Sequence, residues 1–200
     1  MTEALKQLLP DVENISPAKE RLLRVAIDLF YEKGFERTTV RDIAARAGIL
    51  SGSLFHHFKS KQEILFTAMA LTTRGMGEAA EKAVDGLDDP VDQLRALVLC
   101  ELSHVHRDGE HAAYVLVDEW RSLDEEYREA VLAIRDTSYE RCWAEALDGC
   151  AAAGLIKSDP RIARQLIRGA NAWSKNWFQT DGKLTLTDLA DEVLANFLTL

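Results

Sequence analysis

The side chains with the clearest chemical potential lie close together, between residues 51 and 61 of the 200-residue chain. Ser51 and Ser53 are short hydrogen-bonding residues, and the imidazole of His56 and the cation of Lys61 follow them. Short polar side chains near the start of a helix suit base edges in the major groove of DNA, and a lysine suits a phosphate. These residue types and their spacing therefore indicate recognition of duplex DNA.

Two short helices must position these groups. Thr39 and Asp42 form a capping box that opens the first helix, Gly48 ends it, and the second helix spans residues 51–58. Ala44 supplies a small crossing point, and Gly48 supplies the positive φ that a tight turn between steeply packed helices requires. The apolar residues expected to bury one side of this pair against a preceding helix are Ile43, Ala47, Ile49, Leu54 and Phe58.

Capping and stop signals place further helices on both sides of this pair. Ser16, before a proline, opens a helix that Gly34 ends, and Ser60 with Glu63 opens a long helix towards Val84. No alternating strand pattern follows. Further helices are predicted over residues 90–106, 110–121, 124–154, 160–178 and 185–200. The sequence thus predicts an all-α chain of about nine helices.

Composition limits the classes of protein that fit. A hydrophobic content of 47% is enough for a buried core, and the three cysteines include no C-x-x-C pair that would suggest a disulfide framework or a zinc site. The chain lacks a cationic start followed by an apolar run, and it lacks a stretch of about eighteen apolar residues. We therefore expect a cytoplasmic protein with no membrane contact.

The net charge of −9 is unevenly distributed along the chain. Between Ser16 and Phe66, nine Lys and Arg residues stand against six Asp and Glu residues, a local charge of +3. The rest of the chain carries 15 basic and 27 acidic residues, a charge of −12. A cationic segment on an acidic chain fits a phosphate-binding module attached to a self-repelling body.

Residues 38–65, TTVRDIAARAGILSGSLFHHFKSKQEIL, resemble the DNA-binding head of TetR-family repressors. The shared pattern is A-x-x-A-G, then G-x-L-aromatic-x-x-F, then S-K-x-E. The resemblance implies a three-helix helix-turn-helix head followed by a larger helical domain that binds a ligand and dimerises. It divides the chain into a flexible arm (1–15), a helix-turn-helix DNA-binding domain (16–62) and an effector-binding and dimerisation domain (63–200).

By the same resemblance, Thr39 and Lys61 contact phosphates at the two ends of the module. The other residues expected at the DNA are Arg41, Ser51, Gly52, Ser53, Phe55 and His56. Phe55 departs from the family pattern, which usually has a tyrosine that bonds a phosphate, and Leu50 replaces a residue that commonly caps the recognition helix. The alternative is a three-helix core that binds no DNA, with His56 an ordinary surface residue and Arg41 merely solvated.

The second half carries aromatic and polar groups that suit a ligand pocket. Arg135, Arg168 and Asn171 lie among apolar neighbours, and a buried charge is costly unless it is paired or meets a polar ligand. The predicted lining residues, from the helices over 90–178, are Trp120, Tyr139, Trp143, Arg168 and Asn171. The alternative is that the aromatic pairs at one-turn spacing belong to the core.

A dimer interface is expected on the last two helices, because in the family these form a four-helix bundle between subunits. Gly169, Ala170 and Ala172 are small residues that permit close helix crossing. The contribution of the last helix would be Leu189, Val193, Phe197 and Leu200. The same residues could instead form a core within one subunit.

The ending RGAN…WF and the run AGILSGSLFHHF look most like the branch of the family that governs fatty-acid or sterol breakdown and responds to acyl-CoA thioesters. Arg161, Arg164 and Arg168 could then meet the phosphates of such an effector, or form a solvated stripe. The resemblance implies a repressor that binds a palindromic operator in double-stranded DNA as a homodimer, is released by a small-molecule effector, and has no cofactor.

Two alternative functions are a constitutive DNA-binding regulator and a metal-dependent enzyme. A constitutive DNA-binding regulator without an effector would share the same head. A metal-dependent helical enzyme would need ligands such as His104, His106 and His111, but the first two point to different faces of a helix and no carboxylate stands at metal-site spacing beside them. Since no nucleophile elbow or phosphate loop occurs either, we expect no catalytic and no metal-binding residues.

Overall fold

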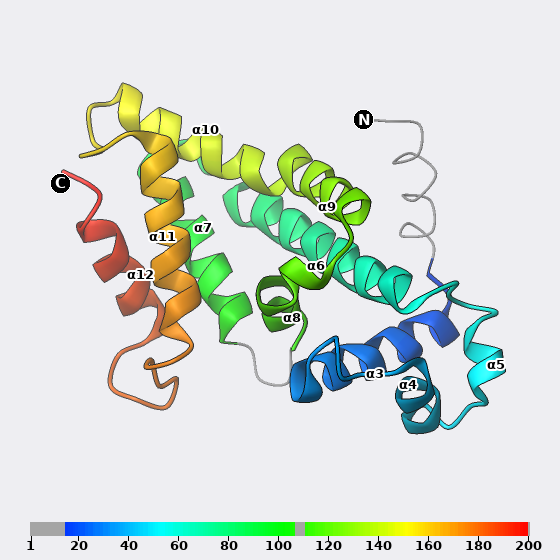
Figure 1. Ribbon diagram of the computed structural model, residues 1–200. Helices are drawn as coiled ribbons and strands as arrows, with labels where there is room; N and C mark the ends of the chain where they lie inside the picture. Colours follow the sequence, from blue (N-terminus) through cyan, green and yellow to red (C-terminus); the bar gives the residue numbers. More distant parts are fainter. Residues whose placement is uncertain (1–14, 107–110, 200) are drawn as a thin grey trace. The chain divides into compact units, whose positions relative to one another are not determined.

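The computed structural model of the chain describes residues 15–106 and 111–199. Within those ranges it contains ten α-helices and one 3₁₀-helix, and extended pairing is limited to one isolated bridge between Ile156 and Leu198 (Figure 1). The predicted all-α class is confirmed. The predicted arm apart from residue 15, the predicted break at Asp108 and Gly109, and Leu200 lie outside the described residues.

In chain order the elements are α3 (Pro17–Lys33), α4 (Val40–Arg46), α5 (Ser51–Leu54), α6 (Lys61–Val84), α7 (Pro90–Val105), α8 (Ala112–Asp118), η1 (Trp120–Ser122), α9 (Glu125–Thr137), α10 (Tyr139–Ala152), α11 (Pro160–Ser174) and α12 (Leu186–Ala195). Local capping explains where most of them begin. Ser16, Thr39, Asp89, Asp159 and Thr185 each accept a backbone N–H bond at a helix start, as their sequence positions predict. None of the helices in the described ranges has the length and apolar character required to cross a bilayer.

The prediction of one helix over 124–154 was wrong. The helix breaks at Ser138, whose backbone (φ −130°, ψ −61°) separates α9 from α10. Gly77 of α6 passes so close that a Cβ at residue 77 would lie 2.1 Å from Oγ of Ser138. Four other helices end earlier than predicted, each followed by a turn: α5 at Leu54, α8 at Asp118, α11 at Ser174 and α12 at Ala195.

The chain forms two compact units and passes between them three times, inside α6, between residues 109 and 110, and inside α9. The first unit consists of Met1–Arg74 and Glu110–Arg135, and the second of Gly75–Gly109 and Asp136–Leu200. The helix-turn-helix therefore shares its unit with the first part of α6 and with α8, η1 and most of α9. This division differs from the predicted boundary after residue 62.

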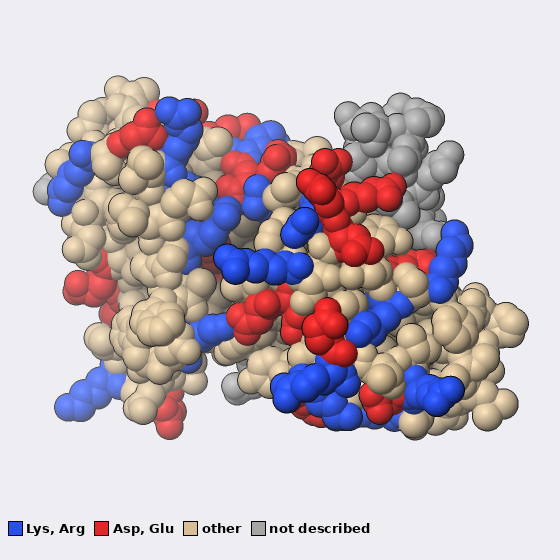
Figure 2. Space-filling view, viewed as in Figure 1, with Lys and Arg blue, Asp and Glu red and all other residues tan. Residues whose placement is uncertain are grey.

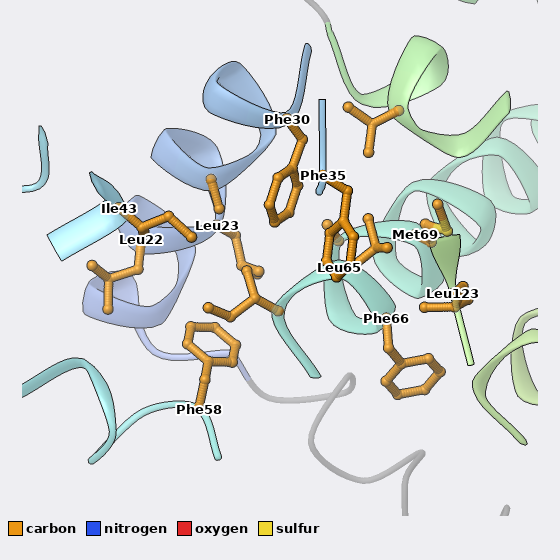
Figure 3. Packing of buried hydrophobic residues seen from close by; sticks show 14 of the residues in the cluster. Leu22, Leu23, Phe30, Phe35, Ile43, Phe58, Leu65, Phe66, Met69 and Leu123 are labelled. Atoms are coloured by element: carbon orange, nitrogen blue, oxygen red, sulfur yellow. The ribbon is translucent and has the colours of Figure 1, made fainter. Parts of the chain in front are cut away.

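The core of the first unit joins the helix-turn-helix to those later elements. Figure 3 shows Leu23 and Phe30 of α3 packed near Leu65 of α6, with Leu123, from the segment before α9, in the same cluster. Ile43, Leu54 and Phe58, predicted to face this core, are buried there, and Ala47 and Ile49 are partly buried against it. The head is thus built on a core that a segment 60 or more residues later completes.

The second unit packs α7, α10, α11 and α12 around Trp143, Leu97, Ile167 and other apolar residues. Gly149 of α10 allows a close crossing with α7, since a Cβ at residue 149 would lie 2.8 Å from Cβ of Pro90. Leu189 of α12 is buried in this core, and Val193 and Phe197 pack against it. Those three residues therefore pack on the core of a single chain, and their part in a dimer interface stays a prediction.

A buried ionic cluster connects three helices of the second unit. Glu101 of α7 is 7% exposed and accepts hydrogen bonds from the Tyr139 hydroxyl, from Asn171 Nδ2 at 2.6 Å and from Arg164 at 3.2 Å. The guanidinium of Arg164 also lies 3.9 Å from the centroid of the Trp143 ring. Burial alone would raise the pKa of Glu101, but the charge of Arg164 and these hydrogen bonds outweigh it and keep the pKa below its ordinary value.

We predict that Glu101→Gln lowers the free energy of unfolding by about 3 kcal/mol, because it removes one of the two carboxylates that pair with the buried cation of Arg164 and leaves only Glu140. Urea unfolding followed by circular dichroism measures this change. Arg164→Gln is the matched single variant, and the double variant should cost less than the sum of the two singles. Additive losses would contradict a direct pairing between the two residues.

Candidate nucleic-acid interface

The α4–α5 segment is organised by bonds that its own residues make. Thr39 caps α4, since its hydroxyl accepts from Asp42 N at 3.1 Å and donates to the Asp42 carboxylate at 2.8 Å. Bonds from the Thr39 backbone N–H and hydroxyl lower the pKa of Asp42, which keeps the capping box charged. After α4, Gly48 adopts φ +71°, and Ile49 N donates to Ala44 O at 3.0 Å. The predicted positive φ at Gly48 is confirmed.

The α5 helix presents one apolar face to the core and one face to solvent. Leu54 and Phe58 are buried, whereas Gly52, Phe55 and His56 are exposed. Ser51 and Ser53 are half-buried, and Thr39 and Arg41 at the start of α4 are exposed. The structure therefore leaves most of the predicted DNA-contacting side chains accessible around two adjacent short helices.

Lys61 is engaged within the unit. Its Nζ donates to Phe35 O at 2.8 Å and lies 4.0 Å from the centroid of the Phe35 ring. Glu119, just after α8, accepts from Phe35 N at 2.9 Å. The backbone N–H and the carbonyl of Phe35 thus both hold the turn between α3 and α4 in place. A phosphate contact by Lys61 stays a prediction.

Lys and Arg side chains gather over α3 and α4 on the face shown in Figure 2. Some of them serve the fold, because Arg46 makes a two-bond ion pair with Glu32 at 2.5 and 2.7 Å, and Arg37 donates to Lys33 O. Ion pairs this exposed contribute little to stability. A cationic surface beside the exposed face of α5 is suited to the sugar-phosphate backbone of DNA.

Gly52 has no structural reason within the chain to be glycine. It lies in α5 with ordinary helical backbone, and a Cβ at residue 52 would meet nothing within 4 Å. Glycine in a helix lowers stability by about 0.5–1 kcal/mol relative to alanine. The missing side chain therefore favours an interpretation in which another molecule approaches the backbone closely here.

The predicted effector-binding residues divide between the two units. Tyr139, Trp143 and Asn171 are buried in the ionic cluster of the second unit, and Arg168 pairs there with Glu140. Trp120 belongs to the first unit, where it is partly buried against the core. The structure brings four of the five together.

Two members of this cluster were missing from the predicted lining. Glu101 occupies the position after Leu94 and Val98 on the apolar face of α7, so a lone carboxylate at core spacing was the available signal. Arg164 had been named only as a possible phosphate contact. Both residues place their charge inside the second unit.

Two polar atoms in the interior of this cluster lack a hydrogen-bond partner in the described part of the chain. Trp143 Nε1 and Asn171 Oδ1 are buried and have no hydrogen-bond partner within the described residues. A groove of about 560 Å³ lies between α10 and α11, and its lining includes Glu140, Arg161 and Arg164 but none of the five predicted lining residues. The arrangement could hold an anionic or polar molecule against α11.

The three histidines considered as metal ligands have other partners. His104 Nδ1 lies 2.8 Å from Cys100 O, His106 Nε2 lies 2.8 Å from Ser174 Oγ, and His111 Nδ1 lies 2.9 Å from an Asp28 carboxylate oxygen. Burial lowers the pKa of His106. In the described part of the chain, no three His, Cys, Asp or Glu residues gather as a metal site requires.

A helix-turn-helix with an exposed second helix, joined to a second helical unit, defines a DNA-binding transcriptional regulator. Comparison with family models agrees with this class. The model for bacterial regulatory proteins of the tetR family matches residues 22–68, and the model for a tetracyclin repressor-like C-terminal domain matches residues 87–200. The chain belongs to the TetR family.

Individual relatives cover nearly the whole chain. The transcriptional repressor KstR2 of Rhodococcus jostii is 32% identical over 193 residues, which span 92% of this chain and 91% of that protein. The fold is also similar to the crystal structure of AibR in complex with isovaleryl coenzyme A and operator DNA, with a TM-score of 0.79 and 27% sequence identity. The similarity covers 90% of this chain and 97% of the AibR chain. The crystal structure of PfiT, described as a superantigen, has a TM-score of 0.80 and 42% sequence identity to this chain. The similarity covers 93% of this chain and 98% of the PfiT chain.

We predict that Gly52→Ala raises the free energy of unfolding by about 0.5–1 kcal/mol and weakens DNA binding by about tenfold, equal to about 1.4 kcal/mol. The added methyl group favours the helix but stands between the backbone and the DNA. Thermal unfolding and fluorescence anisotropy with a labelled duplex measure the two effects. Unchanged DNA affinity would contradict a close approach at residue 52.

Proposed function

We propose that this protein is a dimeric repressor that binds a palindromic operator and is released by an acyl-CoA thioester. The observation that carries the proposal is the exposed outer face of α5 and of the turn that follows it, where Gly52 is open and Phe55 and His56 are accessible. In this proposal Thr39, Arg41 and Lys61 meet phosphates, while Ser51, Gly52, Ser53, Phe55 and His56 lie at the bases or the adjacent backbone. Because operator DNA is part of the chromosome, the protein in this proposal acts in the cytoplasm.

The α11 helix supports dimerisation through its outer face. Ile162, Leu166 and Trp173 lie at helical spacing on α11, Trp177 lies in the turn after it, and all four are more than half exposed. Figure 2 shows a broad uncharged area over α11. Gly169 lies in the middle of this stripe, and a Cβ there would meet nothing within 4 Å. An exposed apolar stripe with a small residue at its centre fits the close crossing of the same helix from a second copy.

The effector class is supported by the relatives and by the chemistry of the second unit. AibR is described in complex with isovaleryl coenzyme A, and the KstR2 of Mycobacterium tuberculosis as a ketosteroid transcriptional regulator. We assign Tyr139, Trp143, Arg168 and Asn171 to the effector site, with the exposed Arg161 beside the groove as a cation for its phosphates, because Arg164 is buried against Glu101 and Glu140. Trp120, which belongs to the other unit, remains a prediction from the sequence.

Release follows from differential affinity. The effector binds better to a dimer whose recognition helices no longer match successive major grooves, about 34 Å apart, than to the DNA-bound form. The α6 and α9 helices both run from one unit into the other, and Gly75 at the boundary within α6 lowers the helix propensity of α6. Effector binding and DNA binding therefore oppose each other.

We expect the protein to shift duplex DNA from the region upstream of its own gene, and saturating acyl-CoA to weaken that binding on the order of ten- to a hundredfold. A mobility-shift titration with long-chain and sterol-derived thioesters measures both. Free coenzyme A is the control ligand. Arg168→Ala should bind DNA normally but require more thioester.

Each outcome of that titration separates one function from another. Binding that no thioester disturbs would discard the acyl-CoA effector and favour the constitutive regulator. Failure to bind any duplex would overturn the repressor itself. A loss of DNA binding in Arg168→Ala would show that the residue is needed for the fold.

We predict that Trp173→Glu converts the dimer into a monomer and reduces operator affinity by at least about tenfold, because a charge enters the apolar face. Size-exclusion chromatography with light scattering measures the mass. Gln165→Glu is the matched control, since it introduces the same charge on the groove side of α11. A dimeric Trp173→Glu variant would contradict the assignment of this face.

A further inference from the structure

Leu50 is placed where the fold gains little from it. It is 80% exposed, more than any other large apolar side chain in the described ranges. It also occupies the N-cap position of α5, with extended backbone and no side-chain cap bond. A serine or aspartate would stabilise the helix start at this position, whereas leucine leaves that bond unmade.

The neighbours of Leu50 do not provide a partner for it. Ile49 is partly buried and Leu54 fully buried in the core of the first unit, so the segment already supplies its inward-facing apolar groups. On the outer side, Phe55 at the end of α5 is 54% exposed. Leu50 and Phe55 therefore stand as exposed apolar groups at the two ends of the helix.

The segment also lacks the side chains that usually read bases. Residues 47–58 contain no Arg, Lys, Asn or Gln, and no Asp or Glu. Its polar groups are two serine hydroxyls and two imidazoles. Among the features that base pairs present in the major groove, the 5-methyl group of thymine is the one that an apolar side chain recognises.

We infer that Leu50 is a specificity-determining residue that contacts the 5-methyl group of a thymine in each operator half-site, with Phe55 as a second apolar contact. This inference rests on the proposed DNA binding and deepens it. The open surroundings of Gly52 allow the backbone of α5 to approach the major groove closely. This approach brings Leu50, two residues before Gly52, within reach of a base edge.

Deoxyuridine provides the test, because it removes only the methyl group of thymine. The wild-type protein first enriches its half-site from a pool of random duplexes, and each thymine of that half-site is then replaced singly by deoxyuridine. At one thymine or more, binding should weaken about fourfold, the value for burial of one methyl group. Leu50→Ala should abolish this sensitivity at the thymine it contacts.

Two further variants keep the result interpretable. Leu184→Ala truncates another exposed leucine, in the second unit, and should retain the full sensitivity to deoxyuridine. Leu50→Ser should raise thermal stability by restoring the cap while losing thymine discrimination, a combination that a purely structural role would not produce.

The outcomes distinguish this inference from the proposed function. If no thymine is sensitive, or if Leu50→Ala keeps the same sensitivity as the wild type, the inference is overturned while DNA binding stands. If the wild-type protein enriches no sequence from the pool, the proposed function itself fails.

Discussion

The buried pairing of Glu101 with Arg164 fixes the rotation of α11 within the second unit. Arg164 and Asn171 are seven residues apart and both reach Glu101, so they define the inner face of α11. Leu166 and Trp173 have the same spacing and are exposed on the outside. Since a helix turn holds 3.6 residues, setting one face inward sets the other outward. The apolar face assigned to dimerisation therefore follows from an interaction in the interior.

A comparable constraint acts in the first unit at Phe35. The N–H of that residue donates to Glu119 and its carbonyl accepts from Lys61, while its ring packs 5.4 Å from that of Phe30. The start of α4 follows this turn directly. The orientation of the helix-turn-helix thus depends on a carboxylate 84 residues further along the chain, which explains why the head and the segment after α8 form one unit.

Sequence reasoning succeeded where a structural feature depends on neighbouring residues. The caps at Thr39 and Thr185 and the stop at Gly34 involve groups within four residues, and all were predicted. It failed at Ser138, because the break there accompanies a close approach of Gly77 some 60 residues earlier. The exposed residues of α5 followed from helical periodicity, whereas the separation of Trp120 from the rest of the predicted pocket depends on tertiary packing.

The glycines in the helices fall into two groups, those where a Cβ would collide with another part of the chain and those where it would not. At Gly77 and Gly149 an added Cβ would collide with Ser138 and with Pro90, so the fold itself requires the absence of a side chain. At Gly52 and Gly169 the same Cβ would meet open space, although both positions lie in helices that glycine weakens. At such a position the missing side chain leaves room for another molecule, although Gly75, which is equally open, is explained by its effect on α6 alone. In the proposed function Gly52 faces DNA and Gly169 faces a second copy, so the open space at each glycine supports both proposals.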